Sequence, residues 1–130
     1  MLSRNIVVWY SPPSCLRVLD KHSQIPSTMN RWVDLARKYS NIDFIIGDPR
    51  ESGRLRESIF GREQIDDWCY YFEKAELAEQ FGDWNHIAEL ADEAREKGLS
   101  PKDATEWRPF IEGYKKIGRK NDAQQLSVTN

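Results

Sequence analysis

The chain has 130 residues, the size of one ordinary domain, and its 39% apolar and 31% charged residues are typical of globular proteins. The net charge of −2 argues against general nucleic-acid binding, which needs a basic surface. The longest uncharged apolar run, residues 6–10, is far too short to cross a bilayer.

The first 62 residues predict an irregular region of short strands with one helix. Residues 6–10 are β-branched and aromatic, which favours a strand, and Pro12 and Pro13 end it because neither can donate to a sheet ladder. The other elements predicted here are strands at 16–19 and 42–46, helical turns at 54–60, and a helix that Thr28 caps and that runs to about Tyr39, with Trp32, Leu35, Ala36 and Tyr39 on one face.

Residues 63–130 predict four helices that pack with the first region in one compact unit. Asp66 or Asp67 begins the first helix and Gly82 ends it, while Asp83 caps a second helix that ends at Gly98. A third helix is predicted at 105–117, with Pro109 tolerated in its first turn, and a fourth at 121–127. The residues predicted to face the core are Trp68, Tyr71, Phe72, Ala75, Ala78, Ile87, Leu90, Ala91, Ala94, Ala123 and Leu126.

The two helix pairs are related by a shift of 36 residues, which places Gly82 on Gly118 and Leu90 on Leu126. A period in the mid-thirties is typical of stacked helical hairpins, in which each hairpin buries the apolar face of its neighbour. Glycine recurs at the end of each first helix because the chain must reverse there.

These helix pairs resemble a tetratricopeptide repeat, which has a small residue in its first helix and Gly-Asp-aromatic at its turn. The residues that carry the resemblance are Ala75, Gly82-Asp83-Trp84 and Ala94 in the first pair, and Trp107, Tyr114, Gly118 and Ala123 in the second. The chain departs from the pattern where Ile87 and Ile111 replace small residues and Lys120 replaces the turn aromatic. The departures predict looser or differently angled packing than in that family.

Three segments, residues 11–20, 68–75 and 109–114, resemble a poorly characterised bacterial family. In that family a soluble domain forms the C-terminal end of multi-spanning membrane proteins, some of them glycosyltransferase-like. The resemblance implies that membrane spans lie upstream of this chain and that this domain lies on the extracytoplasmic face. It leaves open whether Met1 is the natural start.

Cys15 and Cys69 lie 54 residues apart, and this spacing is not a zinc pattern, since His22 and His86 are too far apart to complete a tetrahedral site. One alternative is a disulfide, which the chain-entropy model makes worth roughly 4 kcal/mol. The other is a pair of reduced, buried thiols in a cytosolic protein. The residues alone favour the reduced thiols over the disulfide. With the resemblance to an outward-facing domain, the two alternatives are equally supported.

Several polar residues have a catalytic and a structural interpretation. His86 near Glu89 has the elements of a general base, but such a histidine is more often a packing or surface residue. Asp66 and Asp67 beside Trp68 resemble a sugar-processing site, but an acidic pair also caps a helix, which is the simpler account. At their spacing of three residues, Glu73, Glu76 and Glu79 are predicted to lie on one solvated side of a helix.

The aromatic residues supply the candidate binding site. Most of them are predicted to be core, with Tyr70 and Trp84 lining an exposed groove, because aromatic side chains are favoured as interface anchors. The candidate binding residues are Trp68, Tyr70, Trp84, Trp107 and Tyr114.

The sequence thus predicts a mainly helical α+β fold, with a strand-containing region at 1–62 and a tetratricopeptide-like region at 63–130. The predicted function is a non-catalytic interaction or scaffolding module at the soluble end of a membrane protein. Its partner would be a protein or peptide, including its own membrane part, with no nucleic acid, no metal, no cofactor and no insertion of this chain into the bilayer. The alternative is an accessory domain that binds a glycan or acceptor for a membrane glycosyltransferase.

Overall fold

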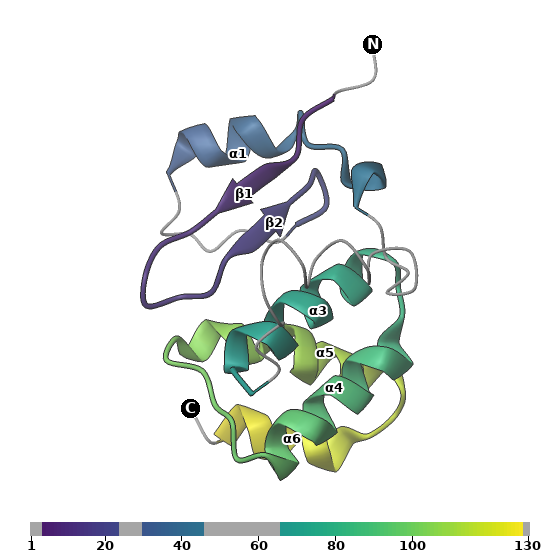
Figure 1. Ribbon diagram of the computed structural model, residues 1–130. Coiled ribbons are helices and arrows are strands. Elements are labelled where there is room, and N and C mark those ends of the chain that lie inside the picture. The colour runs from purple at the N-terminus through teal and green to yellow at the C-terminus, as the bar shows by residue number, and fades with distance from the viewer. Residues whose placement is uncertain (1–3, 24–29, 46–65, 129–130) are drawn as a thin grey trace, which may run out of the picture. The chain divides into compact units, whose positions relative to one another are not determined.

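The computed structural model describes residues 4–23, 30–45 and 66–128 (Figure 1). Of these residues 59% are helical and two short strands pair, so the predicted mainly helical α+β class is confirmed. The chain divides into two compact units. Met1–Trp9 and Val18–Ile65 form the N-terminal unit, and Tyr10–Arg17 and Asp66–Asn130 form the helical unit.

The N-terminal unit contains a two-stranded antiparallel sheet and a short helix. Strand β1 (Val7–Trp9) pairs with β2 (Arg17–Leu19), and helix α1 (Arg31–Arg37) contacts β1. Both strands lie within the ranges that the sequence predicts. Ser40, just after α1, accepts a 3.0 Å hydrogen bond from the backbone N–H of Val7 through its hydroxyl, which ties the end of the helix to the sheet.

Helix α1 begins at Arg31 and is capped by Asn30, whose side chain accepts a 3.0 Å hydrogen bond from the backbone N–H of Trp32. The predicted cap, Thr28, lies outside the described residues. The helix buries none of its residues. The side chains predicted to share one face are largely exposed to solvent: 69% for Trp32, 45% for Leu35 and 61% for Tyr39.

The strand predicted at 42–46 is wrong over the part that the structure describes. Ile42–Phe44 form a 3₁₀ turn, η1, because the side chain of Asn41 accepts a 3.0 Å hydrogen bond from the backbone N–H of Asp43. An asparagine that bonds its own backbone two residues on favours a turn over a strand. Ile46 and the helical turns predicted at 54–60 lie outside the described residues.

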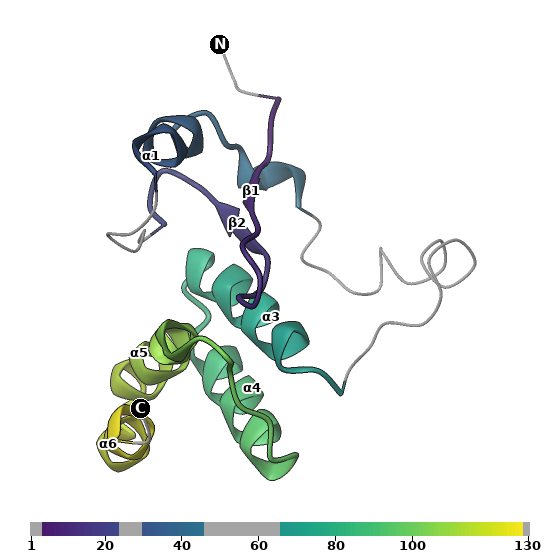
Figure 2. The ribbon, with the colours of Figure 1, turned by 90° about the vertical axis from the view of Figure 1, so that its left-hand side faces the viewer.

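The helical unit confirms the four predicted helices. They are α3 (Trp68–Gln80), α4 (Trp84–Glu96), α5 (Arg108–Lys116) and α6 (Lys120–Val128), as seen in Figures 1 and 2. The predicted third helix begins as a separate 3₁₀ turn, η2 (Ala104–Trp107). Pro109 lies in the first turn of α5, where the backbone N–H groups have no acceptor within the helix, so its missing N–H costs no helical hydrogen bond. Within the described ranges, no helix combines the length and apolar character that a membrane span requires.

The two hairpins, α3–α4 and α5–α6, turn in the same way. Gly82 and Gly118 have φ angles of +70° and +84°, which glycine adopts most readily. Asp83 donates its backbone N–H to Ala78 over 2.9 Å, and Arg119, 36 residues later, donates to Tyr114 over 2.8 Å. The sequence period therefore corresponds to a repeated turn geometry.

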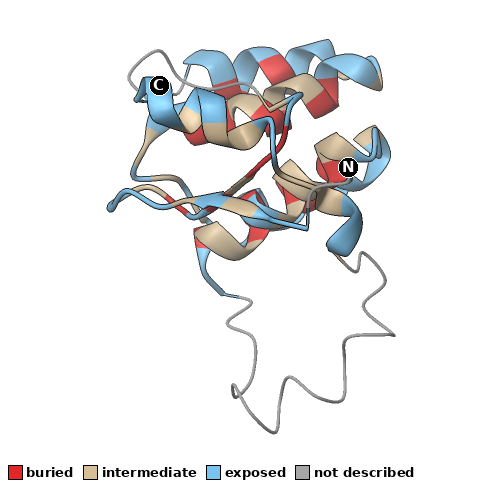
Figure 3. Cartoon of the chain, turned by 90° about the horizontal axis from the view of Figure 1, so that it is seen from above, coloured by how far each residue is buried: buried red, intermediate tan, exposed pale blue. Residues whose placement is uncertain are grey.

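Buried side chains from all four helices, most of them aromatic or small, form the core of the helical unit. Figure 3 colours the buried residues of the chain red. Helix α5 contacts α3, α4 and α6. A Cβ atom on Gly113 would lie only 2.5 Å from Cγ2 of Ile87, so α4 and α5 approach closely at this point. The large side chain at position 87 is thus matched by a residue without a side chain on the facing helix.

Candidate functional site

An open groove of about 820 Å³ lies between the end of α4 and helix α6, within the helical unit. We call it the α4–α6 groove. Its lining residues are Arg95, Gly98, Leu99, Ser100, Trp107, Asn121, Gln124, Gln125, Leu126 and Val128. The lining combines amide side chains with apolar ones, which gives the groove both hydrogen-bonding and hydrophobic surface.

Helix α6 supplies one wall of the groove. One stripe along the helix, which we call the amide stripe, is formed by residues spaced at i, i+3, i+4 and i+7: Asn121, Gln124, Gln125 and Val128. All four are exposed. Leu126 is buried, and it anchors the helix to the core.

The opposite wall forms because α4 ends with a tight reversal. Gly98 has a φ angle of +69°, and Leu99 donates its backbone N–H to Ala94 over 2.9 Å. The reversal packs Leu99 against the core while Ser100 is exposed. Trp107 contributes to the groove from η2 but is buried, so little of its ring is available to a ligand.

Ion pairs fix the helices around the groove. Arg95 donates to Asp122 over 3.3 Å and to Gln125 over 2.9 Å, which joins α4 to α6. Arg119 donates to Asp92 over 2.6 Å and to Asp122 over 2.8 Å. The guanidinium of Arg119 thereby lowers the pKa of both carboxyls, so both stay charged at neutral pH.

Tyr114 extends this network into the core. Its hydroxyl donates a 2.6 Å hydrogen bond to Asp92, and burial together with that bond raises the pKa of Tyr114 to about 12. The guanidinium of Arg119 lies 4.5 Å from the centroid of the same ring. The network is therefore a structural support for the groove.

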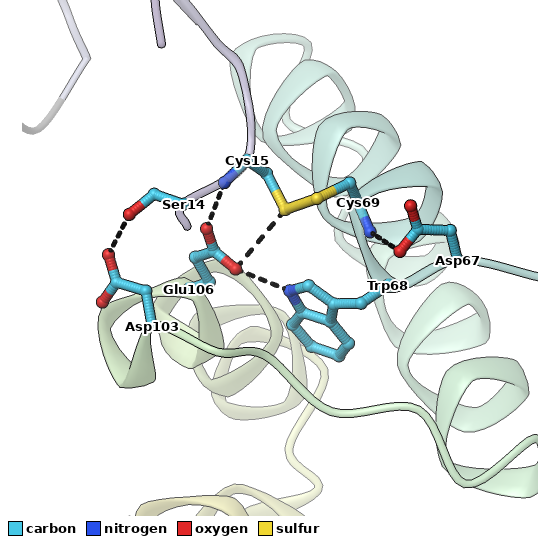
Figure 4. The surroundings of a disulfide bond; sticks show 7 residues. All are labelled: Ser14, Cys15, Asp67, Trp68, Cys69, Asp103 and Glu106. Carbon is cyan, nitrogen blue, oxygen red and sulfur yellow. Dashed lines mark hydrogen bonds between the residues drawn. A yellow bond between two sulfur atoms is a disulfide. The ribbon is translucent and has the colours of Figure 1, made fainter. Parts of the chain in front are cut away.

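A second polar cluster surrounds a disulfide bond between Cys15 and Cys69 (Figure 4). The structure therefore decides between the two alternatives that the sequence leaves open. The disulfide attaches Tyr10–Arg17 to α3, with Cα atoms 5.3 Å apart. Ser14 adds a 2.7 Å hydrogen bond from its hydroxyl to Asp103.

Glu106, from η2, is almost completely buried beside the disulfide (Figure 4). Its carboxylate accepts hydrogen bonds from the backbone N–H of Cys15 over 2.7 Å and from the indole N–H of Trp68 over 2.8 Å. Burial raises the pKa of Glu106, and these two donors oppose the rise. Because both carboxylate oxygens hold structural donors, Glu106 locks the disulfide loop onto η2.

Helix α3 carries a third cluster that corrects a prediction. Glu73 is exposed as expected, but Glu79 forms a two-pronged ion pair with Arg108, at 2.8 and 2.7 Å. Burial raises the pKa of Glu76 to about 7 despite the nearby cations of Arg17 and Arg108. The three glutamates therefore do not share one solvated side, since α3 turns two of them toward α5.

The structure separates the five candidate aromatics into two groups. Trp68, Trp107 and Tyr114 are buried, and Trp68 lies 4.7 Å from Trp107 between ring centroids. Tyr70 and Trp84 are half-buried against the core. Lysine ammonium groups lie over the rings of Tyr70 and Trp84, from Lys74 at 4.6 Å and Lys116 at 5.6 Å. Of the five, only Trp107 reaches the α4–α6 groove.

The polar candidates occupy structural or surface positions. Asp67 caps α3 by accepting from the backbone N–H of Cys69, and Asp66 pairs with Lys97 over 3.3 Å. His86 is exposed, 3.7 Å from Glu89, and His22 is exposed in another part of the chain. In the ranges that the structure covers, no three histidine, cysteine or acidic side chains come together as metal ligands would.

Sequence reasoning missed both the amide stripe and Glu106. The stripe has a detectable signal, since Asn121, Gln124 and Gln125 repeat with helical spacing on the side of α6 away from Ala123 and Leu126. Glu106 has none, because its two hydrogen-bond donors lie 91 and 38 residues away in the chain.

Comparison with known proteins supplies no further guide: no family model, no curated protein and no solved structure matches this chain.

Proposed function

We propose that this chain is a non-catalytic interaction module that binds an extended segment of a partner protein in the α4–α6 groove. The observation that carries the proposal is that exposed amide side chains of α6 and the apolar side chain of Leu99 line the same open groove. Amide side chains both donate and accept, so they can pair with the N–H and C=O groups of an extended peptide.

The side-chain bonds that join the helices around the groove support this proposal. Arg95 joins α4 to α6, and Arg119 adds a second set of ion pairs to the same frame. A preformed site loses little conformational entropy on binding, which raises the affinity available from a small contact area. A groove of this size suits a short peptide and a modest affinity.

The helical hairpins and the disulfide support the wider setting. Stacked helical hairpins generally work by presenting a surface, and the equivalent turns at Gly82 and Gly118 support the tetratricopeptide-like interpretation. Disulfides persist in oxidising compartments. We therefore extend the proposal to a module on the extracytoplasmic face of a bacterial membrane, as part of a larger membrane protein.

The geometry favours a peptide over a glycan. A sugar-binding site needs an open aromatic face, but Trp107 is buried and lysines lie over Tyr70 and Trp84. Titration with a broad sugar panel, followed by tryptophan fluorescence, is expected to give no change. A saturable change would favour the glycan-binding alternative instead.

Peptide selection followed by NMR tests the proposal. Peptides selected from a random display library on the intact, oxidised chain are titrated into the ¹⁵N-labelled protein. We expect the side-chain amide signals of Asn121 and Gln124 to shift. The variant Asn121→Ala/Gln124→Ala should weaken binding about 30-fold, since two hydrogen bonds are lost and each is worth roughly 1 kcal/mol.

The matched control is Asn85→Ala, which removes an exposed amide from α4 outside the groove lining and is expected to leave affinity unchanged. The proposal is overturned if selection gives no binder, or if the selected peptides shift signals away from the groove and bind the double variant normally.

A further inference from the structure

Helix α1 of the N-terminal unit has an exposed apolar side. Trp32, Leu35 and Tyr39 are all exposed, although they are among the largest apolar side chains in the chain. Trp32 and Leu35 lie one turn apart on α1, and Tyr39 follows in the turn that ends the helix, where its backbone N–H donates to Ala36 over 3.0 Å. Contiguous exposed apolar side chains commonly mark a site of interaction with a partner or a membrane.

Two cations lie on the same side of the helix. Arg31 and Lys38 are seven residues apart, two helical turns, and each is three or four residues from Leu35. Both are exposed, and neither forms an ion pair within the described part of the chain. We call this set the α1 face: Arg31, Trp32, Leu35, Lys38 and Tyr39.

The helix carries one carboxylate near the cations of the α1 face. Asp34 is the acidic residue of α1, and Arg37 binds it over 2.8 Å. The guanidinium of Arg37 also donates to the backbone carbonyl of Lys21 over 2.6 Å, so this pair is held against the turn after β2. The Lys38 ammonium acts on the Asp34 carboxylate through charge, while Arg37 forms the direct ion pair with it, so within the described residues the donors of Arg31 and Lys38 can still bind anions outside the helix.

We propose that the α1 face binds the surface of an anionic lipid bilayer, with α1 lying parallel to the bilayer plane. Tryptophan and tyrosine favour the headgroup region, where the ring meets hydrocarbon and the polar edge meets water. Arginine and lysine beside them bind lipid phosphates, and each basic residue strengthens binding to an anionic surface.

Vesicle flotation with the intact, oxidised chain tests the proposal. Vesicles of phosphatidylcholine alone are compared with vesicles of equal parts phosphatidylcholine and phosphatidylglycerol, at low ionic strength. We expect binding to the anionic vesicles only. The variant Arg31→Glu/Lys38→Glu is expected to lower the partition coefficient by roughly tenfold or more, and Trp32→Ser to lower it several-fold.

Matched controls separate the α1 face from net charge and from exposed aromatic surface. Lys102→Glu/Lys120→Glu changes the net charge equally on exposed positions of the helical unit, and Phe81→Ser removes an exposed aromatic ring there. Both controls are expected to retain binding within about twofold. All of the substituted positions are exposed, so circular dichroism should confirm that every variant folds.

The proposal is overturned if the wild-type chain does not bind anionic vesicles, or if the control pair loses binding as fully as Arg31→Glu/Lys38→Glu. If the chain does not bind vesicles but binds soluble polyglutamate through Arg31 and Lys38, the proposal is overturned in favour of an acidic protein partner. None of these outcomes depends on peptide binding in the α4–α6 groove.

Discussion

The two units differ in how they use their apolar side chains. The helical unit buries tyrosine, phenylalanine and isoleucine completely, as at Tyr71, Phe110 and Ile87. In the N-terminal unit α1 buries no residue, and Trp32 and Tyr39 are exposed. Buried apolar packing is therefore concentrated in the helical unit, while most of the exposed large apolar side chains among the described residues lie within the first 45 positions.

The largest expected effect comes from removing the disulfide. By the chain-entropy model, opening a loop with a sequence separation of 54 residues lowers the free energy of unfolding by about 4 kcal/mol. Urea unfolding of Cys15→Ala/Cys69→Ala, followed by circular dichroism, measures this loss. Adding reductant should destabilise the wild-type chain by a similar amount and leave the double variant unchanged. Equal stability of the oxidised wild-type chain and the double variant would contradict the prediction.

A matched pair of leucine truncations tests the contrast between the units directly. Leu90→Ala, in the core of the helical unit, should lower the free energy of unfolding by about 3 kcal/mol because it leaves a cavity. Leu35→Ala, at an exposed site on α1, should lower it by less than about 0.5 kcal/mol. Thermal unfolding of both variants gives the measurement, and similar losses would show that the two units do not differ in this way.

A smaller effect, with a pH dependence, is expected for Glu76. Burial raises the pKa of its carboxyl from 4.5 to about 7. The folded state therefore binds a proton that the unfolded state has released, and stability falls as pH rises from about 4.5 to 7. Glu76→Gln should raise the free energy of unfolding by about 2 kcal/mol at pH 8 and change it little at pH 4, given about 1.4 kcal/mol per unit of pKa and partial contact with solvent.

The exposed Glu93 on α4 supplies the control for that variant. Glu93→Gln should leave the pH dependence of unfolding as it is in the wild-type chain. The prediction is contradicted if the free energies of unfolding of Glu76→Gln and of the wild-type chain change in parallel between roughly pH 5 and pH 8. Glu76 would then not titrate in this range.

Sequence reasoning predicted the helical unit well because each of its signals is local. Asp67 and Asp83 cap helices, Gly82 ends one, and the apolar residues repeat with helical spacing. The failure at 42–46 arose from a competition between signals, since the β-branched pattern favours a strand while Asn41 closes a turn.

The candidate site was harder to predict than the fold. Aromatic residues are ambiguous in a sequence, because the same Trp68 or Tyr114 suits a core as well as a binding surface, and both are buried. The disulfide and the Glu106 cluster depend on contacts between distant segments, which a local pattern does not encode.

The disulfide also determines what a protease can release. Cys15 and Cys69 enclose every residue from 16 to 68, including β2, α1 and η1. A single cut in that interval breaks the backbone but leaves one covalent molecule, because the disulfide still joins the two fragments. The nicked chain would migrate intact on a non-reducing gel and separate into two fragments only after reduction, so in an oxidising environment cleavage of this segment would not detach the helices from the N-terminus.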